Sequence, residues 1–107
     1  MIYWGNIVYD EELKNKSNRF SIYGARGAGR KIYEYMELNG LAGQVEYFCD
    51  GDREIQRQTY RGVSIIDPEE MLRNQEIHVL VGGRAAYEKL KFLTEHHINN
   101  VHILEFW

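Results

Sequence analysis

The chain has 107 residues with a net charge of −3, a size that accommodates one compact domain and a charge that argues against nucleic-acid binding, which needs a basic field. Its single cysteine excludes an internal disulfide framework and is typical of a reducing compartment. No apolar run approaches the roughly 18 residues of a membrane span, and the first residues lack the basic segment of a secretory signal, so we expect a cytoplasmic domain without a membrane partner.

The amino-terminal part of the chain divides into an irregular segment and the start of a regular pattern. Residues 1–19 show no clear periodicity and are interpreted as an amino-terminal extension. From residue 20 the pattern becomes regular, and residues 20–107 are predicted to form one nucleotide-binding-type domain. Residues 20–23 (FSIY) favour a short strand because they are rich in β-forming side chains.

A helix follows this first strand after a glycine-rich turn. Residues 27–39 place Ala28, Ile32 and Tyr35 at intervals of four and three, which gives one apolar stripe at helical spacing. Gly40 then supplies the residue type that commonly ends a helix. The sequence therefore predicts a strand, a tight turn and an amphipathic helix in succession.

The rest of the chain alternates apolar runs with helical patterns. Asp67 and Pro68 suit the cap and the first position of a helix over residues 67–72. A stripe at helical spacing predicts a further helix within residues 85–97. The runs predicted as strands are residues 44–50, 63–66, 77–81 and 101–106.

This alternation predicts parallel strands joined by right-handed crossover helices. We therefore expect an α/β fold, a small Rossmann-like three-layer sandwich with a mostly parallel five-stranded sheet. With the strands numbered along the chain, the expected order is 3-2-1-4-5. Residues 50–62 are close to the minimum length for a parallel crossover, which leaves an antiparallel third strand as an alternative.

Three turns should meet at the carboxyl edge of such a sheet, where doubly wound folds bind their ligands. They are residues 24–30, 50–52 and 82–84. Gly24 permits a tight exit from the strand, and Gly29 permits close contact between helix and sheet. The helix amino terminus between them presents free N–H groups and a partial positive charge, which suits a phosphate.

The turn sequence GARGAG departs from the dinucleotide-binding pattern, because Arg26 stands in place of the middle glycine. The guanidinium either obstructs a pyrophosphate or holds a phosphate itself. Asp50 follows Gly24 by about 26 residues, near the spacing at which an acid accepts hydrogen bonds from a ribose. The residues predicted to bind a nucleotide are Gly24, Ala25, Arg26, Gly27, Gly29, Arg30, Asp50, Gly82 and Arg84.

The stretches YGARGAGRKIYEYMELNG, VEYFCDGD, YRGVSIIDPEEML and VLVGGRAAYEKLKFL together resemble a bacterial family. This is the Rossmann-like, nucleotide-sugar-binding amino-terminal domain of sialic-acid and bacillosamine-type sugar acetyltransferases and related polysaccharide-biosynthesis enzymes. The resemblance implies contact with a nucleotide-sugar and a sugar-modifying enzyme as partner. In the family the transfer chemistry belongs to a following β-helix, so it implies no catalytic activity for this chain alone. The positions that match the family's binding residues are Gly24, Gly27, Gly29 and Asp50.

Three functional hypotheses follow. The first is a non-catalytic nucleotide or nucleotide-sugar binding module associated with sugar-modifying enzymes. The second is a structural domain that has lost its ligand and forms homo-oligomers through aromatic residues such as Trp4 and Trp107. The third is a small NAD(P)-binding oxidoreductase subunit, for which no catalytic residues are recognisable. The candidate cofactors are therefore a nucleotide-sugar or NAD(P).

The remaining reactive residue types are interpreted as structural. Acids flank Cys49, which disfavours its thiolate, so it is expected to be a buried packing residue. His78 and His102 lie among apolar strand residues and are expected to pack there. The adjacent His96 and His97 point in different directions on a helix and suit its carboxyl end better than a metal ion. We predict neither a catalytic residue nor a metal site.

Overall fold

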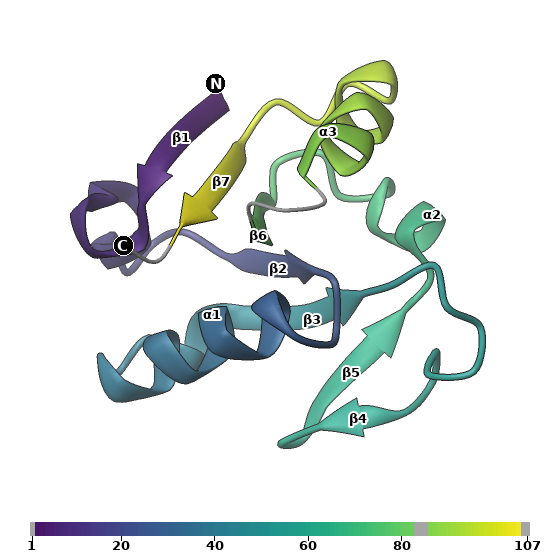
Figure 1. Cartoon of the computed structure of the whole chain (residues 1–107), viewed down its shortest axis with the longest axis horizontal. Coiled ribbons are helices and arrows are strands. Elements are labelled where there is room, and N and C mark those ends of the chain that lie inside the picture. The colour runs from purple at the N-terminus through teal and green to yellow at the C-terminus, as the bar shows by residue number, and fades with distance from the viewer. Residues whose placement is uncertain (1, 83–85, 106–107) are drawn as a thin grey trace.

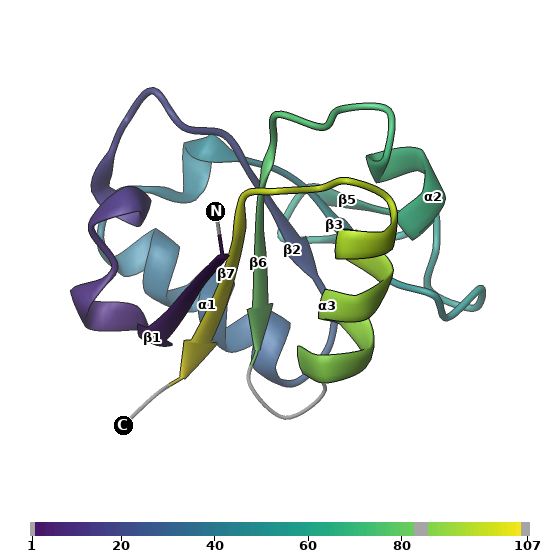
Figure 2. The ribbon, with the colours of Figure 1, turned by 90° about the horizontal axis from the view of Figure 1, so that it is seen from above.

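A computed structural model describes residues 2–82 and 86–105. One sheet forms the middle layer, with α1 on one face and α2 and α3 on the other (Figures 1 and 2). None of the helices in these residues is long and apolar enough to cross a membrane. The strands are β1 (Ile2–Asn6), β2 (Phe20–Tyr23), β3 (Val45–Cys49), β4 (Thr59–Tyr60), β5 (Val63–Ile66), β6 (His78–Gly82) and β7 (Val101–Glu105). The helices are α1 (Ala28–Leu38), α2 (Pro68–Met71) and α3 (Ala86–Glu95), with 3-10 turns at Ile7–Tyr9, Glu11–Lys14 and Ala42–Gln44.

The predicted mostly parallel α/β architecture is confirmed, and the five predicted strands lie in the expected relative order, but the sheet has more strands than predicted and its full order therefore differs. Over residues 2–82 and 86–105 the sheet has seven strands in the order β1-β7-β6-β2-β3-β5-β4. The five predicted strands correspond to β2, β3, β5, β6 and β7, and the sheet continues beyond them with β1 at one edge and β4 at the other. β5 pairs with β3 in parallel, which excludes the antiparallel alternative, and of the described strands only β4 runs antiparallel to its neighbour.

The two unpredicted strands, β1 and β4, lie at opposite edges of the sheet and pair in different ways. β1 belongs to the segment interpreted as an extension and pairs with β7 near the other end of the chain, from Ile2 opposite Val101 onward. β4 forms a two-residue hairpin with β5, in which Arg61 and Gly62 both have positive φ values of 50° and 81°. Such a turn matches the natural twist of a hairpin.

All three of the described helices begin and end within one or two residues of their predicted bounds, and α2 is the shortest of them. The side chain of Asp67 accepts a hydrogen bond from the Glu69 N–H at 2.9 Å, and Pro68 occupies the first turn, as the sequence suggested. The helix ends at Met71, one residue before its predicted end, and has four residues. It therefore covers only a small part of its face of the sheet.

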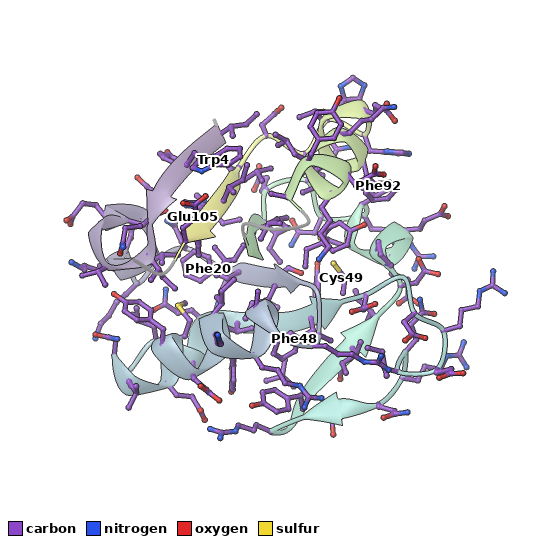
Figure 3. The ribbon with its side chains drawn as sticks, in the orientation of Figure 1. Trp4, Phe20, Phe48, Cys49, Phe92 and Glu105 are labelled. Atoms are coloured by element: carbon purple, nitrogen blue, oxygen red, sulfur yellow. The ribbon has the colours of Figure 1, made fainter. Side chains whose placement is uncertain are left out.

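The core has two halves, one on each face of the sheet. Phe20 and Phe48 point to the α1 side, as Figure 3 shows. The central strands are apolar on both faces, as is typical of parallel sheets covered by helices. The half under α1 includes Phe20, Ile22, Ile32, Met36 and Phe48. The opposite half includes Met71, Val79, Val81, Leu93 and Ile103.

Candidate functional site

The turn that follows β2 is held in a glycine-dependent conformation. Gly24 has a φ of +110° and Gly27 a φ of +43°, values that L side chains rarely adopt. The N–H of Gly24 donates to the carbonyl oxygen of Cys49 at 2.7 Å, so the chain leaves β2 alongside the end of β3. Gly27 immediately precedes α1 and offers no side chain to cap it. Within the described residues, the N–H groups of Gly27 and Ala28 have no hydrogen-bond acceptor.

Two close approaches fix the first turn of α1 against the sheet. A Cβ atom at Gly29 would lie 1.7 Å from the carbonyl oxygen of Gly24. A Cβ atom at Gly82, the last residue of β6, would lie 2.4 Å from Cβ of Ala28. The helix therefore begins directly above the ends of β2 and β6, and its uncapped N–H groups lie at the carboxyl edge of the sheet. Arg84, also predicted to act here, lies outside the described residues.

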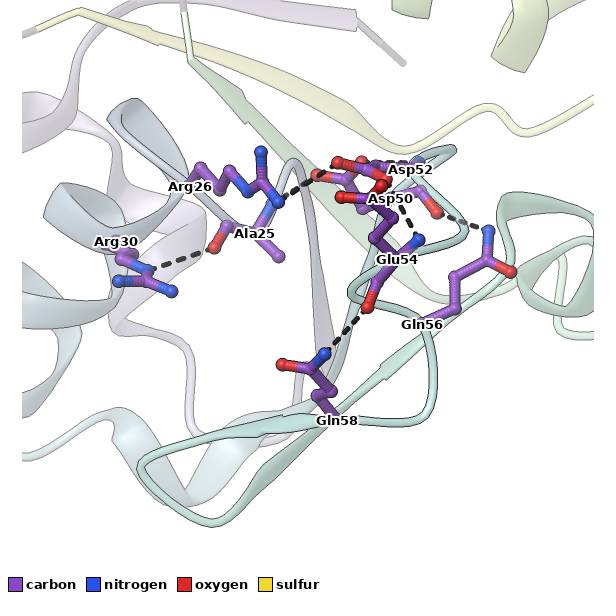
Figure 4. Close-up of polar contacts among 8 residues, drawn as sticks. All are labelled: Ala25, Arg26, Arg30, Asp50, Asp52, Glu54, Gln56 and Gln58. Atoms are coloured by element: carbon purple, nitrogen blue, oxygen red, sulfur yellow. Dashed lines mark hydrogen bonds and ion pairs between the residues drawn. The ribbon is translucent and has the colours of Figure 1, made fainter.

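Asp50 lies against this same turn, at the end of β3 (Figure 4). One carboxylate oxygen, Oδ2, accepts the N–H of Ala25 at 2.9 Å, and the other, Oδ1, accepts the N–H of Asp52 at 2.9 Å. The side chain of Gln56 donates to the Asp50 carbonyl oxygen at 2.8 Å. Asp50 therefore joins the first turn to the loop after β3, a role additional to the predicted contact with a ribose.

The side chain of Arg26 extends across to that loop. Its Nη2 atom lies 3.1 Å from Oδ2 of Asp52, and the two side chains are 59% and 36% exposed. Figure 4 shows Arg26 reaching toward Asp52. The guanidinium is therefore held by an acid at the rim, in an exposed pair that contributes little to stability.

Arg30 supports the turn from within α1. Its Nε atom donates to the carbonyl oxygen of Ala25 at 3.1 Å, and its guanidinium carbon lies 4.4 Å from the ring centroid of Tyr60. Contact with the aromatic face and the backbone fixes the direction of this side chain. Arg30 thus orients the turn and places positive charge behind it.

Lys89 of α3 is a site residue that sequence reasoning missed. Its ammonium nitrogen donates to the carbonyl oxygen of Tyr23 at 3.3 Å and lies 2.8 Å from the position of a Cβ atom on Gly24. The sequence contained one signal, since Lys89 lies three residues after Ala86 and four before Leu93, both buried. A lysine on the buried face of a helix is unusual and indicates a specific role for its charge.

Cys49, beside the turn, is a buried packing residue as predicted. Its side chain is fully buried. Burial raises the pKa of its thiol to about 12, although a hydrogen bond from Ser21 and the charge of Lys89 oppose the shift. A protonated thiol is neither a nucleophile nor a metal ligand. Among the described residues, no group of three or more histidine, cysteine or acidic side chains could hold a metal ion.

A second polar cluster joins β6 and β7 to the amino-terminal segment. His102 is fully buried, and its Nδ1 atom lies 2.7 Å from Oδ2 of Asp10. Its Nε2 atom lies 2.8 Å from Nδ1 of His78, and Tyr3 stacks on its ring with centroids 4.5 Å apart. The two histidines therefore form a hydrogen-bonded chain with Asp10, in addition to the packing role predicted from sequence.

The protonation of this cluster follows from its burial. Burial raises the pKa of Asp10, but the hydrogen bond and charge of His102, with two backbone N–H groups, outweigh it and lower the pKa below the usual range. Burial and the adjacent His102 lower the pKa of His78, against the opposing charges of Glu12 and Asp10. Asp10 is therefore ionised at neutral pH, and His78 is neutral there.

Comparisons with known proteins place the fold. No protein-family model matches the sequence, and the search of curated proteins gave no match. The fold is similar to the crystal structure of a protein called RSP in complex with β-NADH, with a TM-score of 0.60 and 16% sequence identity. The match covers 94% of this chain and 55% of that chain, so this chain spans about half the length of its structural neighbour. The likeness establishes a Rossmann-like α/β fold.

Proposed function

We propose that this chain binds a nucleotide that carries a diphosphate at the carboxyl edge of β2, β3 and β6. The observation that supports this most directly is the start of α1, where the N–H groups of a glycine turn at the edge of the sheet have no acceptor among the described residues. Rossmann-like folds bind dinucleotides at this position, with the pyrophosphate at the helix amino terminus. The structural neighbour was crystallised with β-NADH, which is consistent with this ligand class.

The phosphate would be held by backbone N–H groups and by two cations, one from α3 and one from the turn after β2. Lys89 lies over Gly24, and Arg26 flanks the turn from the other direction. Because Arg26 is exposed and its ion pair among the described residues is with Asp52, a phosphate can replace that carboxylate at small energetic cost. The guanidinium would then hold the phosphate through two N–H groups, which makes up for the missing middle glycine.

The acids after β3 would accept hydrogen bonds from the ribose of the nucleotide. Both carboxylate oxygens of Asp50 already accept one N–H each, and each retains a lone pair for a ribose hydroxyl. Asp52 is adjacent and also negative. A ribose 2′-phosphate would meet two carboxylates there, so the site favours NAD(H) or a nucleotide-sugar over NADP(H).

NAD(H) and a nucleotide-sugar remain the two ligand candidates within this proposal. The sequence resemblance to the sugar acetyltransferase domains favours a nucleotide-sugar and a role beside a sugar-modifying enzyme. The β-NADH in the complex of the structural neighbour favours NAD(H). In both cases we propose a binding module, with the chemistry performed by a partner.

The second candidate function is a structural or assembly domain that binds no nucleotide. One observation favours it, because the two acids beside the turn already have partners within the chain. Asp50 accepts the N–H of Ala25, and Asp52 pairs with Arg26. A site whose charges are already paired needs no ligand for stability.

A thermal-shift panel with NADH, NADPH, a UDP-sugar, UDP and AMP separates these functions. A ligand at 100 times its Kd stabilises by about 2.7 kcal/mol, which raises the Tm of a domain of this size by roughly 10 °C. We expect NADH or the UDP-sugar to give such a shift, and NADPH a smaller one. If no nucleotide moves the Tm at millimolar concentration, the binding proposal is wrong and the assembly function is favoured.

Matched variants test the role of the cations. Lys89→Gln and Arg26→Ala should each weaken the nucleotide that binds by about tenfold, the usual effect of losing one charge-assisted hydrogen bond. Arg73→Ala, at an exposed arginine after α2, serves as the control and should leave the affinity unchanged. Tighter binding by Arg26→Ala would show that the side chain obstructs the turn.

A further inference from the structure

β1 leaves one edge of the sheet open. It is the terminal strand in the sheet order, paired on one side with β7 and with no strand on its other side within the described residues. Its sequence, IYWGN, contains no charged residue and no proline, the features with which proteins usually block an edge. An extended peptide can therefore pair with its backbone N–H and C=O groups.

A groove runs beside this open edge. Its cavity has a volume of about 390 Å³ and is lined by β1 from Tyr3 to Asn6 and by three consecutive acids, Asp10, Glu11 and Glu12. The indole of Trp4 is largely exposed here, at 61%, and Ile2 on the same strand is 48% exposed. An apolar strip next to an acidic wall thus accompanies the free backbone groups.

The charge of the groove selects its occupant. Asp10 is bound to His102 and its side chain is only 9% exposed, so the acids of the wall that face solvent are Glu11 and Glu12. Glu105 of β7, whose carboxylate accepts the indole N–H of Trp4 at 3.1 Å, adds to them. Lys14 offsets one of them, since its ammonium lies 3.8 Å from Glu11 at the surface. Two copies of this edge would bring like charges together, which disfavours self-pairing. A segment that carries lysine or arginine would instead be attracted.

We propose that the open edge of β1 and its acidic groove bind an extended, lysine- or arginine-bearing segment of a partner protein, which adds to the sheet as a further strand. The backbone pairing supplies affinity, and alternate side chains of the partner enter the groove. A cation over the face of Trp4 adds a favourable interaction with the aromatic ring. This site lies on the β1 edge and does not depend on nucleotide binding.

Titration of the full chain with designed peptides tests this proposal. The probes are a seven-residue peptide of alternating valine and lysine, the same peptide with glutamate for lysine, and a version with a central proline. In ¹⁵N NMR spectra we expect the lysine peptide to shift the amide signals of Ile2 to Asn6 and to bind more weakly at high salt. The glutamate and proline peptides should bind at least about tenfold more weakly.

Surface variants and a measurement of the oligomeric state by sedimentation complete the test. Trp4→Ala and Glu11→Lys should each weaken the lysine peptide severalfold, whereas Tyr87→Ala and Glu69→Lys, exposed positions on α3 and α2, should not. All four substitutions are at the surface, so a preserved Tm verifies folding. Equal binding of the glutamate peptide, shifts away from β1, or no binding would overturn the proposal. A dimer in sedimentation that Trp4→Ala dissociates would also overturn it, because the edge would then belong to a second copy.

Discussion

Replacing Gly29 by alanine tests how the glycine turn is joined to the sheet. The added Cβ atom would lie 1.7 Å from the carbonyl oxygen of Gly24 and 2.8 Å from its carbonyl carbon. Both obstacles are backbone atoms, so no side-chain rotation relieves the overlap. Gly24 is itself held by its hydrogen bond to Cys49. Either the turn or the whole first turn of α1 must move.

The expected loss of stability follows from this geometry. Overpacking of a well-packed site costs about 1–3 kcal/mol and more where the backbone must shift. Alanine recovers less than about 1 kcal/mol through its higher helix propensity. We therefore expect a net destabilisation of about 2–4 kcal/mol, which lowers the Tm by roughly 10–15 °C for a domain of this size.

Urea unfolding followed by circular dichroism measures this loss directly. Gly43→Ala is the matched control, since nothing lies within 4 Å of its Cβ position in the 3-10 turn Ala42–Gln44. It should change the free energy of unfolding by less than about 0.5 kcal/mol. If Gly29→Ala is as stable as the control, the close contact between α1 and the turn after β2 does not exist and the proposed phosphate site loses its frame.

Three further outcomes are expected. Asp50→Asn places an amide NH₂ against the N–H of Ala25 or Asp52 and should lower the free energy of unfolding by about 1–3 kcal/mol in urea titrations. An unchanged free energy of unfolding would mean that the carboxylate does not join the two loops. Because the pKa of Cys49 is raised to about 12, iodoacetamide at pH 8 should label the native chain far more slowly than the unfolded chain. Because the pKa of His78 is lowered on folding, the unfolded chain binds more protons than the folded chain below about pH 6.5. The free energy of unfolding should therefore fall as the pH drops through this range. The fall should be smaller in His78→Gln.

Local patterns predicted the strand, turn and helix unit well. The residues of β2, the glycine turn and α1 adjoin in sequence, so short-range periodicity and glycine placement suffice. Asp50 was also predicted to lie at the turn, because parallel strands end at one edge, and its hydrogen bond to Ala25 agrees with this. Its use of both oxygens for backbone N–H groups could not be predicted, since it depends on the path of the loop after β3.

The features that the sequence did not predict depend on contacts between distant segments. β1 has its partner near the far end of the chain, and nothing in a local window indicates that pairing. Lys89 reaches the turn only because α3 packs beside β6, across the sheet from α1. The chain of Asp10, His102 and His78 likewise requires three separate segments to meet. In each case the residue type is visible in the sequence, but its partner is set by the topology.

The pairing of β1 with β7 also determines how the chain would respond to mechanical load. The strands run side by side in the same direction, with Ile2 opposite Val101 and Asn6 opposite Glu105. A tension that draws the start of β1 and the end of β7 apart acts along both strands, so their hydrogen bonds are strained together in shear and cannot open one after another. Single-molecule pulling through these two ends should therefore meet a higher rupture force than pulling from a handle that peels β1 away sideways.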